Sequence, residues 1–162
     1  MKRAPMLVFL LVSVLGLALA SGASARAIVH VSGTDLGPDA GTTVCQPVNH
    51  SGSLLSCDTP DFATSYSGDL TGTISSNFTW MINCTSSLIE GQAVETFTGS
   101  VASLGSGTLT WRTKFHATFD CSTFTLSNLR GTGTIMSGTG ALQRLRGTLI
   151  FIDNTYSGSL SQ

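Results

Sequence analysis

The sequence predicts an all-β protein, a sandwich or barrel of eight or nine short antiparallel strands, and three observations support this prediction. Apolar and polar residues alternate over residues 109–121, with Thr113 as the one polar residue on the apolar face. Shorter alternating runs are separated by glycine, serine and asparagine, and 18 of the 162 residues are glycine. No segment carries the apolar stripe, with a period of 3.6 residues, that is typical of an amphipathic helix.

The first 25 residues are predicted to be a signal peptide. Lys2 and Arg3 precede an almost wholly apolar run at 6–20, and the Ala-Ser-Ala sequence at 23–25 fits a signal-peptidase site. This run is shorter than the roughly 20 residues that span a bilayer. We expect cleavage after Ala25, with cleavage at 20–22 as the alternative. The remaining residues, 26–162, are then a secreted or otherwise extracytoplasmic chain that no longer contacts a membrane.

Four cysteines lie beyond this leader, at Cys45, Cys57, Cys84 and Cys121. An even number of cysteines in an exported chain indicates two disulfides, although four cysteines allow three pairings. We favour Cys45–Cys57, which closes a local loop, and Cys84–Cys121, which joins distant segments. No Cys-x-x-Cys spacing supports a zinc site, and the three histidines show no metal-ligand spacing either. We therefore expect neither a metal nor another cofactor.

The order of elements follows from the alternating runs and from proline. A first strand at 27–31 and a loop at 35–61, held by the local disulfide and containing three prolines, make up an N-terminal part at 26–61. The main β-structure is expected at 62–162, which contains no further proline, and both parts belong to one domain. Its strands are predicted at 66–74, 78–84, 92–102, 109–121, 122–128, 131–137, 146–152 and 155–160.

The glycine-rich stretch at 130–147 (RGTGTIMSGTGALQRLRG) is interpreted as a turn between strands. A dinucleotide-binding fingerprint needs a third glycine where Met136 or Gln143 stands, followed by a helix. Without the leader, six basic residues oppose nine acidic ones, so the basic surface of a nucleic-acid-binding protein is absent from the sequence. Nucleic acid is therefore not an expected partner.

Three motifs occur in the order and at the spacing found in one protein family. They are SYSGDLTGT at 65–73, ETFTG at 95–99 followed by GSGTL at 105–109, and SGTGALQRLRG at 137–147. The chain resembles, over roughly 62–152, an uncharacterised and largely bacterial family with an allene-oxide-cyclase-like barrel, an architecture shared with dirigent proteins. It departs from that family in its four cysteines, its leader, the segment at 35–61 and the Gln143-Arg144 pair.

The resemblance implies a single antiparallel eight-stranded β-barrel, here stapled by two disulfides, with a hydrophobic ligand in its lumen. Allene oxide cyclases fold a fatty-acid epoxide inside the barrel with help from a carboxylate, and dirigent proteins hold reactive aromatic radicals. Glu95 is the candidate catalytic residue, because it stands mid-strand with Phe97 on its face. The alternative is a solvent-facing glutamate, or one paired with Arg112 or Lys114.

Four aromatic residues are candidates to line the lumen, although large aromatics at such positions also build ordinary cores: Tyr66, Phe97, Trp111 and Phe115. His116 is expected on the surface, and no Gly-x-Ser-x-Gly motif supports a catalytic serine. Low aromatic content favours a non-enzymatic protein, either a carrier of a small apolar ligand or a structural protein. The alternative is an isomerase of the allene-oxide-cyclase or dirigent-like type. Both a monomer and an oligomer remain open.

Overall fold

The computed structural model describes residues 27–37 and 41–162. These residues form nine antiparallel strands and one short 3₁₀-helix at Gly140–Leu142, which confirms the all-β prediction. None of the helices in these two ranges is long and apolar enough to cross a membrane. The predicted leader at 1–25 and its cleavage site lie outside the described residues. The strands are β1 (Ile28–Asp35), β2 (Val44–Pro47), β3 (Leu54–Gly68), β4 (Leu70–Asn83), β5 (Leu88–Val101), β6 (Gly105–Asp120), β7 (Thr125–Gly138), β8 (Arg146–Ile152) and β9 (Thr155–Ser161).

Eight of the nine strands form a closed ring. The order in the sheet is β1-β9-β8-β7-β6-β5-β4-β3-β2, and β1 also pairs with β3, which joins the two ends. β2 stays outside the ring as an edge strand on β3. Ring closure leaves β3 and β1 without a free edge along the paired positions, and an unpaired edge is where sheets aggregate.

The seam that closes the ring is short and is reinforced by side chains. β1 and β3 share three register pairs, Gly33–Gly68, Thr34–Ser67 and Asp35–Tyr66. The Tyr156 hydroxyl of β9 accepts from the Leu70 N–H at 2.7 Å and lies 3.0 Å from the Ser67 carbonyl, to which it can donate. The Asp69 carboxylate accepts from the Ser32 N–H at 2.8 Å. The turn between β3 and β4 is thereby tied to both β1 and β9.

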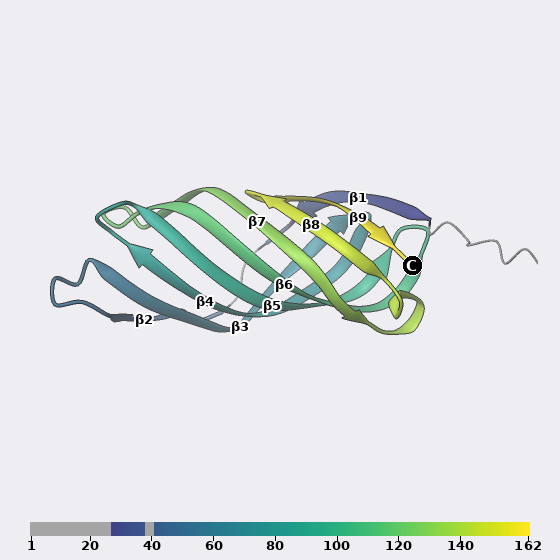
Figure 1. The fold of residues 1–162 in the computed structure, drawn as a ribbon, viewed down its shortest axis with the longest axis horizontal. Coiled ribbons are helices and arrows are strands. Elements are labelled where there is room, and N and C mark those ends of the chain that lie inside the picture. Colours follow the sequence, from purple (N-terminus) through teal and green to yellow (C-terminus); the bar gives the residue numbers. More distant parts are fainter. Residues whose placement is uncertain (1–26, 38–40) are drawn as a thin grey trace, which may run out of the picture.

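The strands of the ring differ greatly in length. β3 to β7 have 14 to 16 residues each, whereas β8, β9 and β1 have seven or eight. Figure 1 shows the long strands running on past the short ones toward the left of the view. One half of the ring is therefore walled on all sides, and the other half is open where the short strands end.

Several segments differ from their predicted form, and one difference is that the strands predicted at 122–128 and 131–137 form the single strand β7. Positions 35–61, expected as a loop, contain β2 and half of β3, and the boundary expected between 61 and 62 falls within β3. The prolines fit because Pro47 lies on the edge strand and Pro60 lies at a register shift between Thr59 and Phe62. The strand predicted at 66–74 is instead a hairpin, since the chain reverses at Gly68 with φ +104°. Apolar and polar residues continue to alternate across this tight turn, so the sequence pattern gave no sign of the turn.

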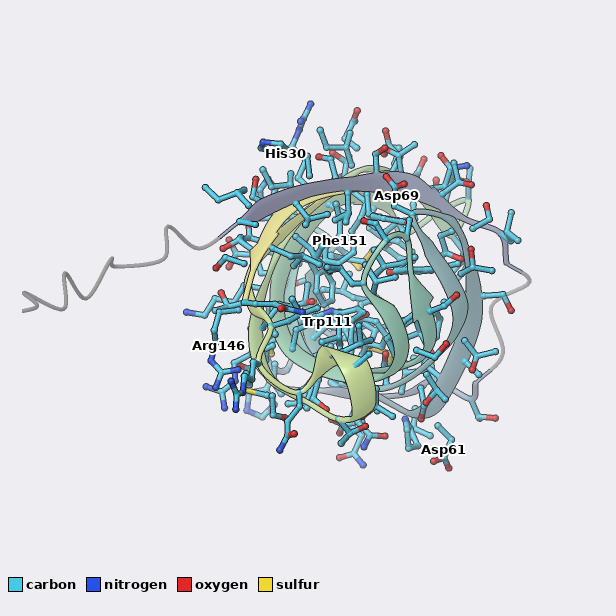
Figure 2. The ribbon with its side chains drawn as sticks, turned by 90° about the vertical axis from the view of Figure 1, so that its right-hand side faces the viewer. His30, Asp61, Asp69, Trp111, Arg146 and Phe151 are labelled. Carbon is cyan, nitrogen blue, oxygen red and sulfur yellow. A yellow bond between two sulfur atoms is a disulfide. The ribbon has the colours of Figure 1, made fainter. Side chains whose placement is uncertain are left out.

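The fully walled half of the ring is filled with apolar side chains. Leu70, Phe97, Leu109 and Trp111 are fully buried there, and Leu142 from the 3₁₀-helix closes the end. Figure 2 looks onto this end, with Trp111 inside the ring and the helical turn in front. The connection from β7 to β8 thus serves as a plug. The glycine-rich stretch does contain the predicted turn, but its residues 130–138 belong to β7 and residues 140–142 form the 3₁₀-helix.

Inner-face glycines make room for aromatic rings. A Cβ added at Gly91 would lie 2.5 Å from Cζ of Phe115, and one added at Gly99 would lie 2.7 Å from Cζ of Phe97. Both distances are shorter than real side chains allow, so these rings occupy the space that a larger residue would need. The glycines at strand positions are therefore packing partners of the aromatic residues.

Both expected disulfides are present. Cys45 and Cys57 are direct register partners on β2 and β3. Cys84 and Cys121 join the turn after β4 to the turn after β6, and they are separated by 37 positions along the chain. The second bridge therefore fastens two hairpin tips at the open end of the ring.

A half-open aromatic cavity with a buried carboxyl group

The open half of the ring contains a cavity of about 710 Å³. Its rim is formed where the short strands end, by Asp35 at the end of β1 and Leu36 after it, and by residues 153–155 at the turn from β8 into β9. The long strands β3 to β7 supply the floor and the opposite wall. Ligand pockets of proteins usually have volumes of about 300–1,000 Å³, so this space can hold a small organic molecule.

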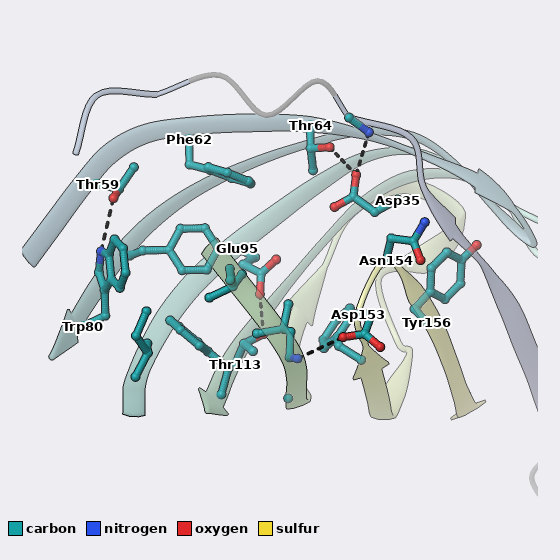
Figure 3. A pocket seen from close by; sticks show the side chains of 18 of the residues that line it. Asp35, Thr59, Phe62, Thr64, Trp80, Glu95, Thr113, Asp153, Asn154 and Tyr156 are labelled. Carbon is teal, nitrogen blue, oxygen red and sulfur yellow. Dashed lines mark hydrogen bonds between the residues drawn. The ribbon is translucent and has the colours of Figure 1, made fainter. Parts of the chain in front are cut away.

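Aromatic side chains supply most of the apolar wall (Figure 3). The eight that line the cavity are Phe62, Tyr66, Phe78, Trp80, Phe115, Phe119, Phe151 and Tyr156. Several of them support one another, since the Phe78 ring lies edge-on to Phe62 at 4.8 Å and to Phe115 at 5.6 Å between centroids. The Trp80 indole donates to the Thr59 hydroxyl at 3.2 Å, which fixes the orientation of its ring.

Glu95 on β5 lies where the cavity meets the filled half of the ring. Only 5% of its surface is exposed, and the Thr113 hydroxyl of β6 donates to its Oε1. Burial raises the pKa of this carboxyl above its usual range, while the Thr113 hydroxyl and the Trp111 indole lower it. The Trp111 N–H is close enough to lower the pKa of Glu95, although it forms no regular hydrogen bond with the carboxyl group. Glu95 can therefore hold a proton at a higher pH than an ordinary glutamate.

A second carboxyl group faces the same space from β1. Asp35 accepts hydrogen bonds from the Thr64 hydroxyl and from the Gly37 N–H, the latter at 3.0 Å. The negative charge of Asp35 contributes to the raised pKa of Glu95. The two carboxyl groups therefore repel each other across the cavity. Figure 3 shows both pointing toward the enclosed space, with Asp153 at the rim.

Two buried polar atoms beside Glu95 have no hydrogen-bond partner. Ser76 on β4 and Trp111 on β6 are the cross-strand neighbours of Glu95, so the three residues form one row across the inner face. Within the described part of the chain, neither Ser76 Oγ nor Trp111 Nε1 finds a partner. Buried polar groups are normally satisfied, and an exception needs a physical explanation.

The structure brings together three of the five residues predicted for the site. Glu95, Tyr66 and Phe115 line the cavity, with Tyr66 stacked on Tyr156 at 5.1 Å between ring centroids. Phe97 and Trp111 lie instead in the filled half, stacked on each other at 6.4 Å and fully buried. These two residues therefore belong to the packed core, which was the alternative to a position in the cavity wall.

The alternative, in which Glu95 faces solvent or pairs with Arg112 or Lys114, is wrong. Arg112 and Lys114 are exposed on the outer face of β6, whereas Glu95 is on the inner face of β5. His116 is exposed, as expected. In the described ranges, no group of three or more His, Cys, Asp or Glu side chains could hold a metal ion.

Three polar residues at or beside the site, Thr113, Asp35 and Ser76, are not among the residues predicted from the sequence. Thr113 could have been found, because it is the one polar residue on the apolar face of its strand and it contacts Glu95. Asp35 was assigned to a loop, and only ring closure brings it to the cavity. Ser76 gave no signal, since serine is common throughout the sequence.

No model of a known protein family matches the chain, and no curated protein matches it either.

Proposed function

We propose that the ring of eight strands is a β-barrel whose lumen binds a small apolar ligand, and that the protein carries this ligand without transforming it. The half-open cavity of about 710 Å³ with its aromatic wall is the observation that carries the proposal. An eight-stranded barrel is just wide enough for its own side chains to fill it. The half of the ring that its own side chains do not fill is therefore explained by the three short strands β8, β9 and β1 at one side.

The proposed location of this carrier is outside the cytoplasm. The two disulfides are compatible with an extracytoplasmic protein, because reducing compartments keep thiols free. The predicted leader at 1–25 agrees with export. The resemblance to the barrel family with allene-oxide-cyclase-like architecture supports the same placement of a ligand, in the lumen of a closed sheet.

The second candidate function is that of an allene-oxide-cyclase-like or dirigent-like enzyme, and Glu95 favours it. A buried carboxyl with a raised pKa, held by Thr113 at the end of an apolar cavity, is suited to exchange a proton with a reactive hydrophobic substrate. Under this alternative, the wild-type protein accelerates the cyclisation of an allene oxide, and Glu95→Gln reduces the rate to that of the uncatalysed reaction. If the wild-type protein causes no such acceleration, the carrier function stands alone.

Binding is tested with the neutral fluorescent probe N-phenyl-1-naphthylamine, excited in its own absorption band. Titration into the non-reduced protein should show saturable enhancement. Leu129→Trp places an indole in the cavity, and we expect it to weaken binding about tenfold or more, the equivalent of about 1.4 kcal/mol. Leu88→Trp is the matched control, because Leu88 is exposed and lies outside the cavity. Equal binding by both variants, or no saturable binding by the wild type, would refute the proposed function.

A further inference from the structure

We propose that the ligand is a hydrophobic amine, an organic cation whose apolar body lies among the aromatic rings and whose ammonium group faces Asp35 and Glu95. This inference rests on the proposed function and specifies its ligand class. Three observations support it, namely the charge of the cavity, the faces of its aromatic rings and the unpaired hydroxyl group of Ser76 beside Glu95.

The charge of the cavity has one sign. Asp35, Glu95 and Asp153 all line it, and among the residues that the structure describes no lysine, arginine or histidine does. Figure 3 shows the Asp35 and Glu95 carboxyl groups directed toward the cavity, whereas the Asp153 carboxylate at the rim accepts from the Leu129 N–H at 3.0 Å. Opposite charge nearby is the usual way to keep a partly buried carboxylate ionised. A ligand cation would supply that charge, whereas a fatty-acid carboxylate would add a further negative charge to the site.

The aromatic wall adds a second attraction for a cation. The face of an aromatic ring attracts a cation within about 6 Å of its centre, and the effect is stronger when water is excluded. Trp80, the best ring type for this interaction, lines the cavity together with Phe62 and Tyr156. An apolar amine can contact such rings with both its hydrocarbon body and its charged end, which a neutral lipid cannot do.

The unpaired hydroxyl beside Glu95 gives the third argument. Ser76 Oγ is buried on the strand beside Glu95 and has no partner in the described residues, although Ser76 does not itself line the cavity. An ammonium group has three N–H donors and no acceptor. It therefore matches a wall that offers carboxylate oxygens, with the unpaired hydroxyl oxygen of Ser76 on the strand next to Glu95. An alcohol, with its single O–H donor, would satisfy fewer of these acceptors.

The test compares three probes that share one alkyl chain, namely decylamine, 1-decanol and decanoate, each displacing N-phenyl-1-naphthylamine at pH 7. We expect decylamine to bind roughly tenfold or more tightly than 1-decanol, because hydrogen bonds to charged groups are stronger than those between neutral groups. Decanoate should bind most weakly. Equal affinities for the amine and the alcohol, or tightest binding of decanoate, would overturn the inference.

Substitutions of the two carboxyl groups test whether they are responsible for the preference for an amine over an alcohol. Glu95→Gln and Asp35→Asn should each lower the ratio of amine to alcohol affinity about tenfold. Glu90→Gln is the matched control, because Glu90 is on the same strand but exposed on the outer face, and the variant changes the net charge equally. Asp35 also accepts from the Gly37 N–H, so Glu95→Gln decides the matter if Asp35→Asn fails to fold. An unchanged ratio in Glu95→Gln, or an equal loss in Glu90→Gln, contradicts the inference.

The failure of this inference and that of the proposed function are distinguishable. If 1-decanol displaces the probe and decylamine does so no better, the cavity binds apolar ligands and only the preference for an amine is wrong. If none of the three compounds binds and the probe does not bind either, both proposals are wrong.

Discussion

Glu95 illustrates how one residue can work against the stability of the fold. A carboxyl group that is buried loses its hydration, and the Thr113 hydroxyl offsets only part of that cost. Because the pKa of Glu95 is raised in the folded protein, the folded state binds the proton more tightly than the unfolded state does. The protonated Glu95 side chain therefore stabilises the folded state at low pH, relative to the ionised side chain. This stabilisation is lost as the pH rises from the unfolded pKa, about 4.3, through the folded pKa.

Glu95→Gln should remove this pH dependence. We expect the free energy of unfolding of the variant, relative to the wild type, to increase as the pH is raised from 4 to 8, since glutamine never has to ionise inside the protein. Urea unfolding at a series of pH values measures this difference. Glu90→Gln, on the outer face of the same strand, should follow the wild-type profile. Parallel profiles for Glu95→Gln and the wild type would show that the carboxyl is not buried in solution.

Single residues were only partly predictable. The mid-strand position of Glu95, with Phe97 on its face, left open whether its side chain faces the interior or the solvent, and the structure buries it. The role of Asp35 could not be foreseen, because its closeness to Glu95 depends on the pairing of β1 with β3, strands whose partner positions are more than 30 residues apart. Local patterns carry no information on such long-range pairing.

At the level of elements, the seam between β1 and β3 is where the ring is held with the fewest pairs. Three register pairs close it, and the Tyr156 hydroxyl of β9 contacts both the Leu70 N–H and the Ser67 carbonyl there. The hydroxyl thus satisfies a buried donor at the start of β4 that no other described residue is shown to satisfy.

Tyr156→Phe should lower the free energy of unfolding by about 1–3 kcal/mol, because the Leu70 N–H loses its partner while burial stays the same. Urea denaturation of the variant at neutral pH measures the loss. Faster amide hydrogen exchange at Leu70 and at the β1–β3 pairs than at the β5–β6 pairs would place the weakening at the seam. A loss below about 0.5 kcal/mol would mean that the hydroxyl does not hold the seam.

Elements with long alternating patterns were predicted well, and those with turns inside them were not. The alternation over 109–121 corresponds to most of β6 at Gly105–Asp120. By contrast, the hairpin at Gly68 was hidden, since Tyr66 and Leu70 both face the interior on either side of the reversal. The strand β2 was concealed by Pro47 and by its position on the edge, where all four of its residues are exposed.

At the level of the whole molecule, unequal strand lengths create the cavity. A ring in which all eight strands were as long as β6 would have walls on every side, whereas the short β8, β9 and β1 leave one half open. The filled half contains the plug residues Leu142 and Leu145, so the ring is a packed core at one end and a pocket at the other. Composition and periodicity report that strands exist, and they do not report how far neighbouring strands overlap. The sequence therefore predicted the fold class without predicting the cavity.

A crystal structure of the non-reduced protein grown with 1-decanol tests the central claim most directly. We predict that the open half of the ring remains hollow, with the alkyl chain lying among Phe62, Phe115 and their neighbours and the hydroxyl within hydrogen-bonding distance of Glu95. A structure in which these aromatic rings have turned inward to fill the space, with no ligand between them, would contradict the account of this protein as a carrier.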